Sequence, residues 1–205
     1  MLGHQGDDDV IHQAVSSPVF CVCGAVSPRL PSYHSDGGYD HLIRVWTKLS
    51  DGLNGKLLRE IEGHDGFINS ICFDEEGAKM FSADSNGIVI VWNSYIHPQV
   101  DTKRKRKGTG GYVYDWTLFK KIAIDELQGN VINSLSLHPN GRKLLVHVRN
   151  SVLCMLDLRS YTVMQRYLGA SNFKEHIRST LQRMRVLCYL RLRGWFCVCV
   201  EHRNR

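Results

Sequence analysis

A histidine and two cysteine pairs are the residues whose types and spacing could support chemistry. His64 follows a glycine, and such a histidine can act as a metal ligand or as a general base. The pairs Cys21/Cys23 and Cys197/Cys199 could offer thiolates to a metal, but their C-x-C spacing differs from the C-x-x-C of zinc ribbons and redox sites. We therefore expect reduced thiols in a cytosolic setting and no metal, and we interpret His64 as a structural histidine satisfied by hydrogen bonds.

Two charged runs could bind ions or polyanions. Residues 7–9 are three aspartates, but a calcium loop needs spaced oxygen ligands and a glycine turn, so we interpret them as a solvated acidic tail. The segment from Lys103 to Lys107 is five consecutive cations followed by a glycine-rich stretch, which is typical of a solvated loop. A nuclear-localisation or anionic-surface role stays open for this cluster. Because it lacks interleaved aromatic residues, single-stranded nucleic acid is not an expected partner.

The composition fits one soluble domain with a sizeable core. Of 205 residues, 43% are hydrophobic and 22% are charged, and the net charge of +6 is too small by itself to indicate nucleic acid binding. No run approaches the roughly 18 apolar residues of a membrane span, so any membrane contact is expected to be peripheral. The sequence also contains no nucleophile-elbow, zinc-protease, Walker or dinucleotide motif. We expect no enzymatic activity, no cofactor and no small-molecule substrate.

Two segments with the same ending reveal an internal repeat. Residues 39–46 and 85–92 each place a turn residue six positions before a tryptophan that closes an alternating apolar run. Trp46 and Trp92 are 46 positions apart, near the roughly 40 to 45 residues of a four-stranded propeller blade. A degenerate third copy at 150–157 has a leucine in place of the tryptophan.

The segments between these endings predict antiparallel strands. Residues 67–73 and 131–137 read as strands, and each is followed by a glycine-containing turn and a second apolar strand. Their period of two predicts strands buried on one face, with Ile68, Ser70 and Cys72 pointing inward. The expected unit is therefore a β-meander that repeats along the chain.

This combination of motifs resembles the WD40-repeat family, because the glycine-histidine pair, the turn, the acid or amide and the tryptophan fall in register. The resemblance implies an all-β fold of WD40-type propeller blades, incomplete at about three repeats. In WD40 blades a histidine, a hydroxyl residue, an aspartate and the tryptophan form a buried hydrogen-bonded set. By resemblance, the structural blade residues are Asp40 and Trp46 in the first repeat, His64, Asn86 and Trp92 in the second, and Asn150 in the third.

A narrower resemblance covers most of the chain, from about residue 38 to residue 181. Residues 67–74, 138–145, 155–159 and 167–181 resemble the WD40 region of ciliary scaffold proteins. This resemblance implies a non-enzymatic interaction scaffold of the cilium base and transition zone, which acts in cilium assembly and ciliary trafficking. The implied partners are transition-zone or basal-body proteins, and the implied location is cytoplasmic, at the basal body and centrosome. The alternative is a basic, peptide-like binder of anionic membrane or nucleic acid.

The predicted organisation has three parts. Residues 1–37 are expected to be irregular, residues 38–181 to form the partial WD40 region with a basic insertion loop at 96–115, and residues 182–205 to form an aberrant basic tail, non-native or helical. The family pattern breaks after Leu181, and reading plausible codons for the tail one base later restores a tryptophan-terminated strand. The sequence therefore predicts a tail produced by a shifted reading frame.

Overall fold

In the computed structural model, every regular element of the described part of the chain is a β-strand. The model describes residues 21–26, 33–48, 55–98, 112–149, 152–167, 178–182, 185–192 and 194–200. Within these ranges, three sheets have four antiparallel strands each, and a fourth sheet has three. Among these residues no helix is long and apolar enough to cross a membrane.

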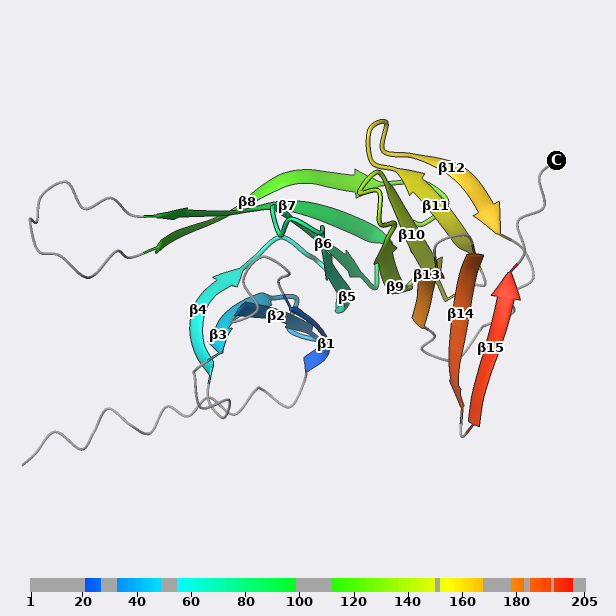
Figure 1. Cartoon of the computed structure of the whole chain (residues 1–205), viewed down its shortest axis with the longest axis horizontal. Coiled ribbons are helices and arrows are strands. Elements are labelled where there is room, and N and C mark those ends of the chain that lie inside the picture. The colour runs from blue at the N-terminus through cyan, green and yellow to red at the C-terminus, as the bar shows by residue number, and fades with distance from the viewer. Residues whose placement is uncertain are drawn as a thin grey trace, which may run out of the picture.

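Each sheet is a meander of consecutive strands, which we call blades 1 to 4 in chain order (Figure 1). Blade 1 contains β1 (Cys21–Val26), β2 (Tyr33–Gly38), β3 (Ile43–Lys48) and β4 (Gly55–Ile61). Blade 2 contains β5 (Ile68–Phe73), β6 (Lys79–Asp84), β7 (Ile88–Pro98) and β8 (Tyr112–Ala123). Blade 3 contains β9 (Ile132–Leu137), β10 (Lys143–Val148), β11 (Leu153–Asp157) and β12 (Thr162–Tyr167). Blade 4 contains β13 (Arg178–Gln182), β14 (Arg185–Leu192) and β15 (Gly194–Val200).

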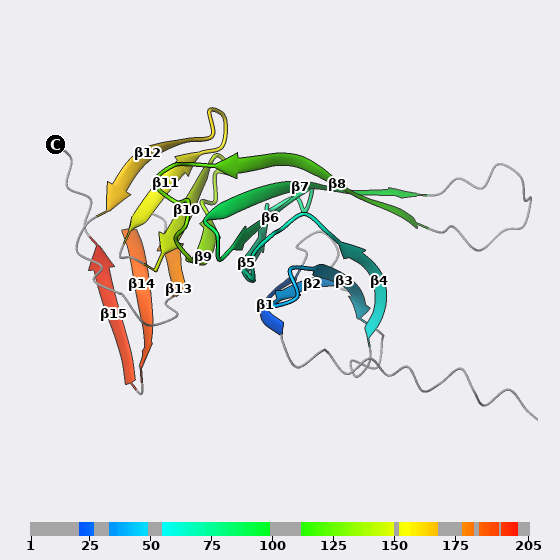
Figure 2. The same ribbon diagram turned by 180° about the vertical axis from the view of Figure 1, so that it is seen from behind.

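The blades follow one another along an arc, with the first strand of each blade on the inside (Figures 1 and 2). The inner strands β1, β5, β9 and β13 contact their neighbours in that order. One apolar cluster joins blades 1 and 2 around Ile43, Ile68 and Trp92, and another joins blades 2 and 3 around Val91 and Leu144. The core therefore lies between the sheets, in the manner of propeller blades.

This arrangement corrects the expectation that each strand is buried on one face. In β5 the four residues from Ile68 to Ile71 are all buried, whereas Cys72, expected to point inward, is only partly buried. A middle blade has a neighbour on each side, so both of its faces are covered and the period-two alternation disappears.

Three of the predicted segment boundaries also differ from the structure. Residues 21–26 and 33–38 are paired strands within the segment expected to be irregular, because blade 1 needs β1 and β2 beside β3. β7 extends to Pro98 and β8 begins at Tyr112, so paired strands enter both ends of the expected insertion loop. Lys103 to Lys107 lie outside the described residues.

The helical alternative for the tail is wrong. β14 and β15 pair along their length, from Val186 opposite Val200 to Leu192 opposite Gly194. Valine, tyrosine, phenylalanine and tryptophan are abundant in these strands, and such residues favour a pleated sheet over a helix. The apolar run from Phe196 to Val200 is thus part of the last strand of blade 4.

Candidate functional site

The best-defined constellation of polar side chains lies within blade 2 and begins at His64, between β4 and β5. Its neighbour Gly63 has a φ of +156°, and a Cβ there would lie 2.7 Å from the Trp92 ring atom Cη2. Glycine therefore lets the chain pass directly over the indole of Trp92. This close approach carries the imidazole of His64 into the interior, where it is buried.

His64 lies in the loop after β4 and connects to residues of two strands, β6 and β7. Its Nδ1 lies 2.8 Å from Asp84 Oδ2, at the end of β6, and its Nε2 lies 2.6 Å from Ser82 Oγ. Trp92 Nε1, on β7, donates to the same Ser82 Oγ at 2.8 Å. Since an indole N–H is only a donor, the Ser82 hydroxyl accepts from Trp92 and donates to Nε2, which leaves the Nδ1 proton for Asp84. We call His64, Ser82, Asp84 and Trp92 the polar network.

Asp84 also organises the turn between β6 and β7. Its Oδ1 accepts the backbone N–H groups of Asn86 and Ile88, both at 2.9 Å. Burial alone would raise the pKa of the Asp84 carboxyl, but the hydrogen bonds from His64, Ile88 and Asn86 outweigh it and hold the pKa below its usual value. The carboxylate is therefore charged, and its charge is satisfied inside the protein.

The polar network is closed to solutes. Its four residues are buried, and their side-chain polar atoms bond to one another or to the adjoining turn. A general base or a metal ligand needs a lone pair that a substrate or ion can reach, and His64 presents none. The arrangement connects the loop after β4 to β6 and β7.

The network corrects the assignment of Asn86. Its side chain is exposed, and Asp84, two residues earlier, contacts His64 instead. Asn86 sits in the turn, where its carbonyl oxygen accepts the backbone N–H of Gly129 from the loop that leads into blade 3. The sequence signal that could have identified the right residues is Ser82-x-Asp84, which alternates along β6 on the face of Trp92.

Blade 1 contains a weaker version of this arrangement. Trp46 is buried, as Trp92 is, but Asp40 lies in the turn after β2 and is about one-third exposed. Asp40 pairs with Arg44 at 2.5 Å, and this hydrogen-bonded ion pair lowers the pKa of the carboxyl. The strand register instead places Asp36, which is buried, at the position of Ser82.

Blade 3 has no polar side chain at the corresponding positions. The pairing of Leu144 with Leu156 matches that of Met80 with Trp92, which puts Val146 and Val148 at the positions of Ser82 and Asp84. Val146, Val148 and Leu156 are fully buried in the cluster between blades 2 and 3. Asn150, assigned to this repeat from the sequence, lies outside the described residues.

The thiols of Cys72 and Cys154 are not activated. Burial raises the pKa of each of these two thiols to about 12. A thiol with so high a pKa stays protonated at neutral pH and is a poor nucleophile.

Comparisons with known proteins agree with this geometry. Residues 55–93, which run from β4 through β7 up to the residue after Trp92, match the family model described as WD domain, G-beta repeat. The sheets are WD40-type blades. The predicted fold of incomplete WD40 propeller blades is therefore confirmed. The matched repeat begins with the outer strand of blade 1 and ends in blade 2. The polar network thus connects the loop after the outer strand of blade 1 to blade 2.

The chain is similar to jouberin. It is 35% identical to jouberin of Mus musculus over 164 residues, which cover 80% of this chain and 15% of that protein, and the values for Rattus norvegicus are the same. It is also 29% identical to small ribosomal subunit protein RACK1y of Oryza sativa over 72% of this chain and 35% of that protein. The chain thus spans about 15% of the length of its jouberin relatives.

Proposed function

We propose that this WD40 region is a non-enzymatic scaffold that binds other proteins. The observation that carries the proposal is the similarity to jouberin, together with a polar network whose side-chain polar atoms bond to one another or to the adjoining turn. A network that holds strands together leaves the blade surfaces and their connecting turns for contact with partners. Such contacts require no cofactor and no small-molecule substrate.

The resemblance to ciliary scaffold proteins extends the proposal to a location. We place the protein in the cytoplasm, at the basal body, centrosome and transition zone, with other proteins of these structures as its partners in cilium assembly and ciliary trafficking. Supporting this placement is the jouberin similarity over 80% of the chain. The described surface carries both aromatic residues, such as Tyr39 and Phe67, and charged residues, as protein-binding surfaces do.

Localisation in ciliated cells tests the proposal. A tagged full chain should concentrate at the cilium base, whereas Trp92→Ala should not, because loss of the indole disrupts blade 2. The matched control is Asn86→Ala, which changes an exposed side chain of the same hairpin and should localise as the unaltered chain does. A distribution of the unaltered chain like that of the tag alone would contradict the ciliary role.

The alternative binder of anionic membrane or nucleic acid differs in its response to salt. Binding driven by Lys103 to Lys107 or by the arginine-rich tail should weaken steeply as ionic strength rises, whereas a contact with the blades should change little. Measuring recovery of co-precipitated proteins across a salt series separates the two. A steep loss would favour the alternative.

The shifted-frame origin of residues 182–205 also stays a proposal. Sequencing the transcript across the codons for Leu181 and Gln182 tests it directly. Comparing the chain with a frame-restored version in ciliated cells that lack the endogenous protein then measures the cost of the tail. Equal rescue of cilium formation would show that the tail does not impair function.

A further inference from the structure

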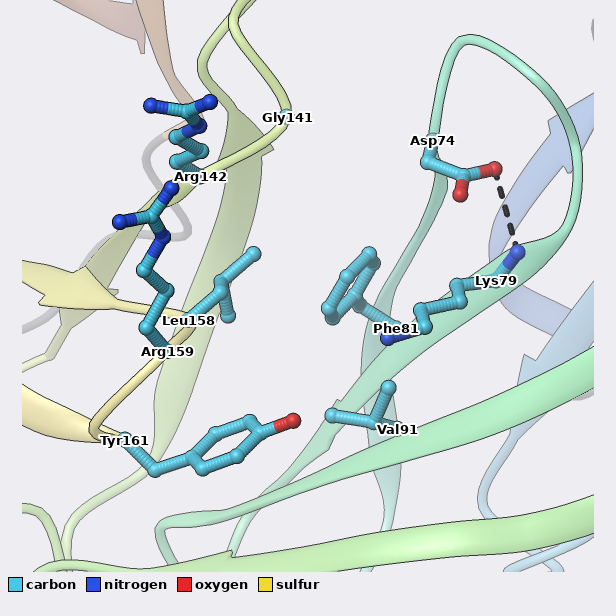
Figure 3. A pocket seen from close by; sticks show the side chains of 9 residues that line it. All are labelled: Asp74, Lys79, Phe81, Val91, Gly141, Arg142, Leu158, Arg159 and Tyr161. Atoms are coloured by element: carbon cyan, nitrogen blue, oxygen red, sulfur yellow. Dashed lines mark hydrogen bonds between the residues drawn. The ribbon is translucent and has the colours of Figure 1, made fainter.

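A cavity opens between blades 2 and 3 at the end of the sheets where their hairpins turn. Its volume is about 100 Å³. Blade 2 contributes residues of β6 and β7, and blade 3 contributes the β9–β10 and β11–β12 turns, as Figure 3 shows. Phe81, Val91 and Leu158 supply its apolar walls, while Lys79, Arg142 and Arg159 supply cations.

The charge around the cavity is unbalanced. Lys79, Arg142 and Arg159 are accompanied by one lining carboxylate, that of Asp74. Asp74 Oδ1 already accepts the backbone N–H groups of Ala78 and Lys79, at 2.7 and 3.1 Å, and so closes the turn between β5 and β6. The carboxylate therefore serves its own hairpin and lies across the cavity from the two arginines (Figure 3).

Both arginines are exposed, and neither guanidinium has a carboxylate partner within the described ranges. Both come from turns of blade 3, and Figure 3 shows them along one side of the cavity. Lys120 adds a further cation, because its Nζ lies 5.7 Å from the centre of the lining Tyr161 ring. Guanidinium groups form paired hydrogen bonds with carboxylates, so an acidic group would complement this rim.

We propose that this cavity binds an acidic, apolar segment of a partner protein. One aliphatic side chain enters between Phe81, Val91 and Leu158, and a neighbouring carboxylate binds Arg142 and Arg159. The apolar walls distinguish this ligand from free phosphate, nucleic acid or a lipid headgroup, none of which supplies an aliphatic group at that depth. The inference rests on the proposed scaffold function and names the chemistry of one partner.

A labelled ten-residue peptide that alternates Glu and Leu is the probe, with fluorescence anisotropy of the full chain as the measurement. We expect saturable binding, which weakens about tenfold when Gln replaces Glu, because hydrogen bonds to charged groups are lost. Replacing Leu by Ser should weaken binding as well. Equal binding of all three peptides would overturn the proposal, and this comparison uses only the unaltered chain.

Variants of the chain test whether the peptide binds in the cavity. Arg142→Gln with Arg159→Gln should weaken binding about tenfold. Arg59→Gln with Lys121→Gln removes the same charge from exposed positions outside the cavity and should leave affinity unchanged. Arg142→Glu with Arg159→Glu should instead gain affinity for a peptide that alternates Lys and Leu. Equal losses in the two glutamine variants would overturn the assignment to the cavity.

The same experiment separates other anionic ligands and the proposed function itself. Inorganic phosphate or vesicles of phosphatidylcholine with phosphatidylserine that compete fully with the peptide would overturn the peptide assignment. Arg142→Gln with Arg159→Gln should still reach the cilium base, because the polar network is intact in it. Loss of peptide binding with retained localisation therefore concerns the cavity alone, and failed localisation of the unaltered chain concerns the scaffold function.

Discussion

Blades 2 and 3 build the same hairpin with different interiors. In blade 2, Ser82 and Asp84 bind His64 and Trp92, whereas in blade 3 the corresponding strand positions hold Val146 and Val148. Both hairpins have the same strand pairing, and the residues at these positions are buried in both. A WD40 blade can thus be closed either by a fully satisfied hydrogen-bond network or by aliphatic packing. A half-converted interior would leave a buried polar group without a partner.

The loops before the two blades also differ in what they bring to the interior. Blade 2 combines Gly63 with the large indole of Trp92, while Leu127 is fully buried in the cluster that contains Leu156. A glycine therefore stands before blade 2, where the chain passes over a large ring, and a buried leucine stands before blade 3, where the interior is aliphatic.

The largest expected effect comes from Trp92→Ala. Truncation leaves a cavity and also deprives Ser82 of its donor, so we expect a loss of about 3 to 5 kcal/mol in the free energy of unfolding. Leu156→Ala in blade 3 removes packing alone and should cost less. Urea midpoints of the two variants measure the difference. A smaller loss for Trp92→Ala than for Leu156→Ala would contradict the role given to the indole.

A smaller effect is expected for His64→Ala. The imidazole supplies two hydrogen bonds, and its removal leaves the buried Asp84 partly satisfied by backbone N–H groups, so we expect a loss of about 1 to 3 kcal/mol. Urea unfolding checks this loss, with Gln128→Ala, an exposed residue of the matching loop, as the control. Equal urea midpoints for His64→Ala and Trp92→Ala would contradict the smaller contribution to stability that we assign to His64.

The two blades should also differ in their response to acid. Because folding lowers the pKa of Asp84, this carboxyl stabilises the protein fully above its unfolded pKa, about 3.9, and that contribution is lost as pH falls through the folded value. Val148 of blade 3 has no such linkage. The difference in unfolding free energy between the unaltered chain and Asp84→Asn should therefore shrink below about pH 4. A difference that stays constant from pH 7 to pH 3 would refute the linkage.

The smallest effect is expected for Asn86→Ala. Its side chain is exposed, and its contact with the next blade uses the backbone carbonyl, which the substitution retains. We expect a change within about 0.5 kcal/mol, measured by urea unfolding. A loss of unfolding free energy comparable to that of His64→Ala would show that the Asn86 side chain takes part in the polar network.

How much of this could be predicted depends on the range of the interactions involved. The repeat, its strands and the roles of His64 and Trp92 follow from local motifs. Local motifs point to Asn86 for the position that Asp84, two residues earlier, occupies in the network. The reason is that a sequence does not show which polar residue of a tight turn directs its side chain inward. The cavity between the blades escaped prediction altogether, since it assembles turns from two blades and depends on how the sheets pack.

The paired strands β7 and β8 extend well beyond the edge of their blade. β7 pairs with β6 only as far as Asn93 and then continues with β8 to Pro98, five residues beyond the edge of the blade. At about 3.3 Å per residue, the pair Pro98 and Tyr112 lies roughly 16 Å beyond the edge of the blade. The Debye length at physiological salt is about 8 Å. The far ends of β7 and β8 thus lie some two Debye lengths beyond the edge of blade 2, where a charge on this hairpin would act on the inter-blade arginines only weakly.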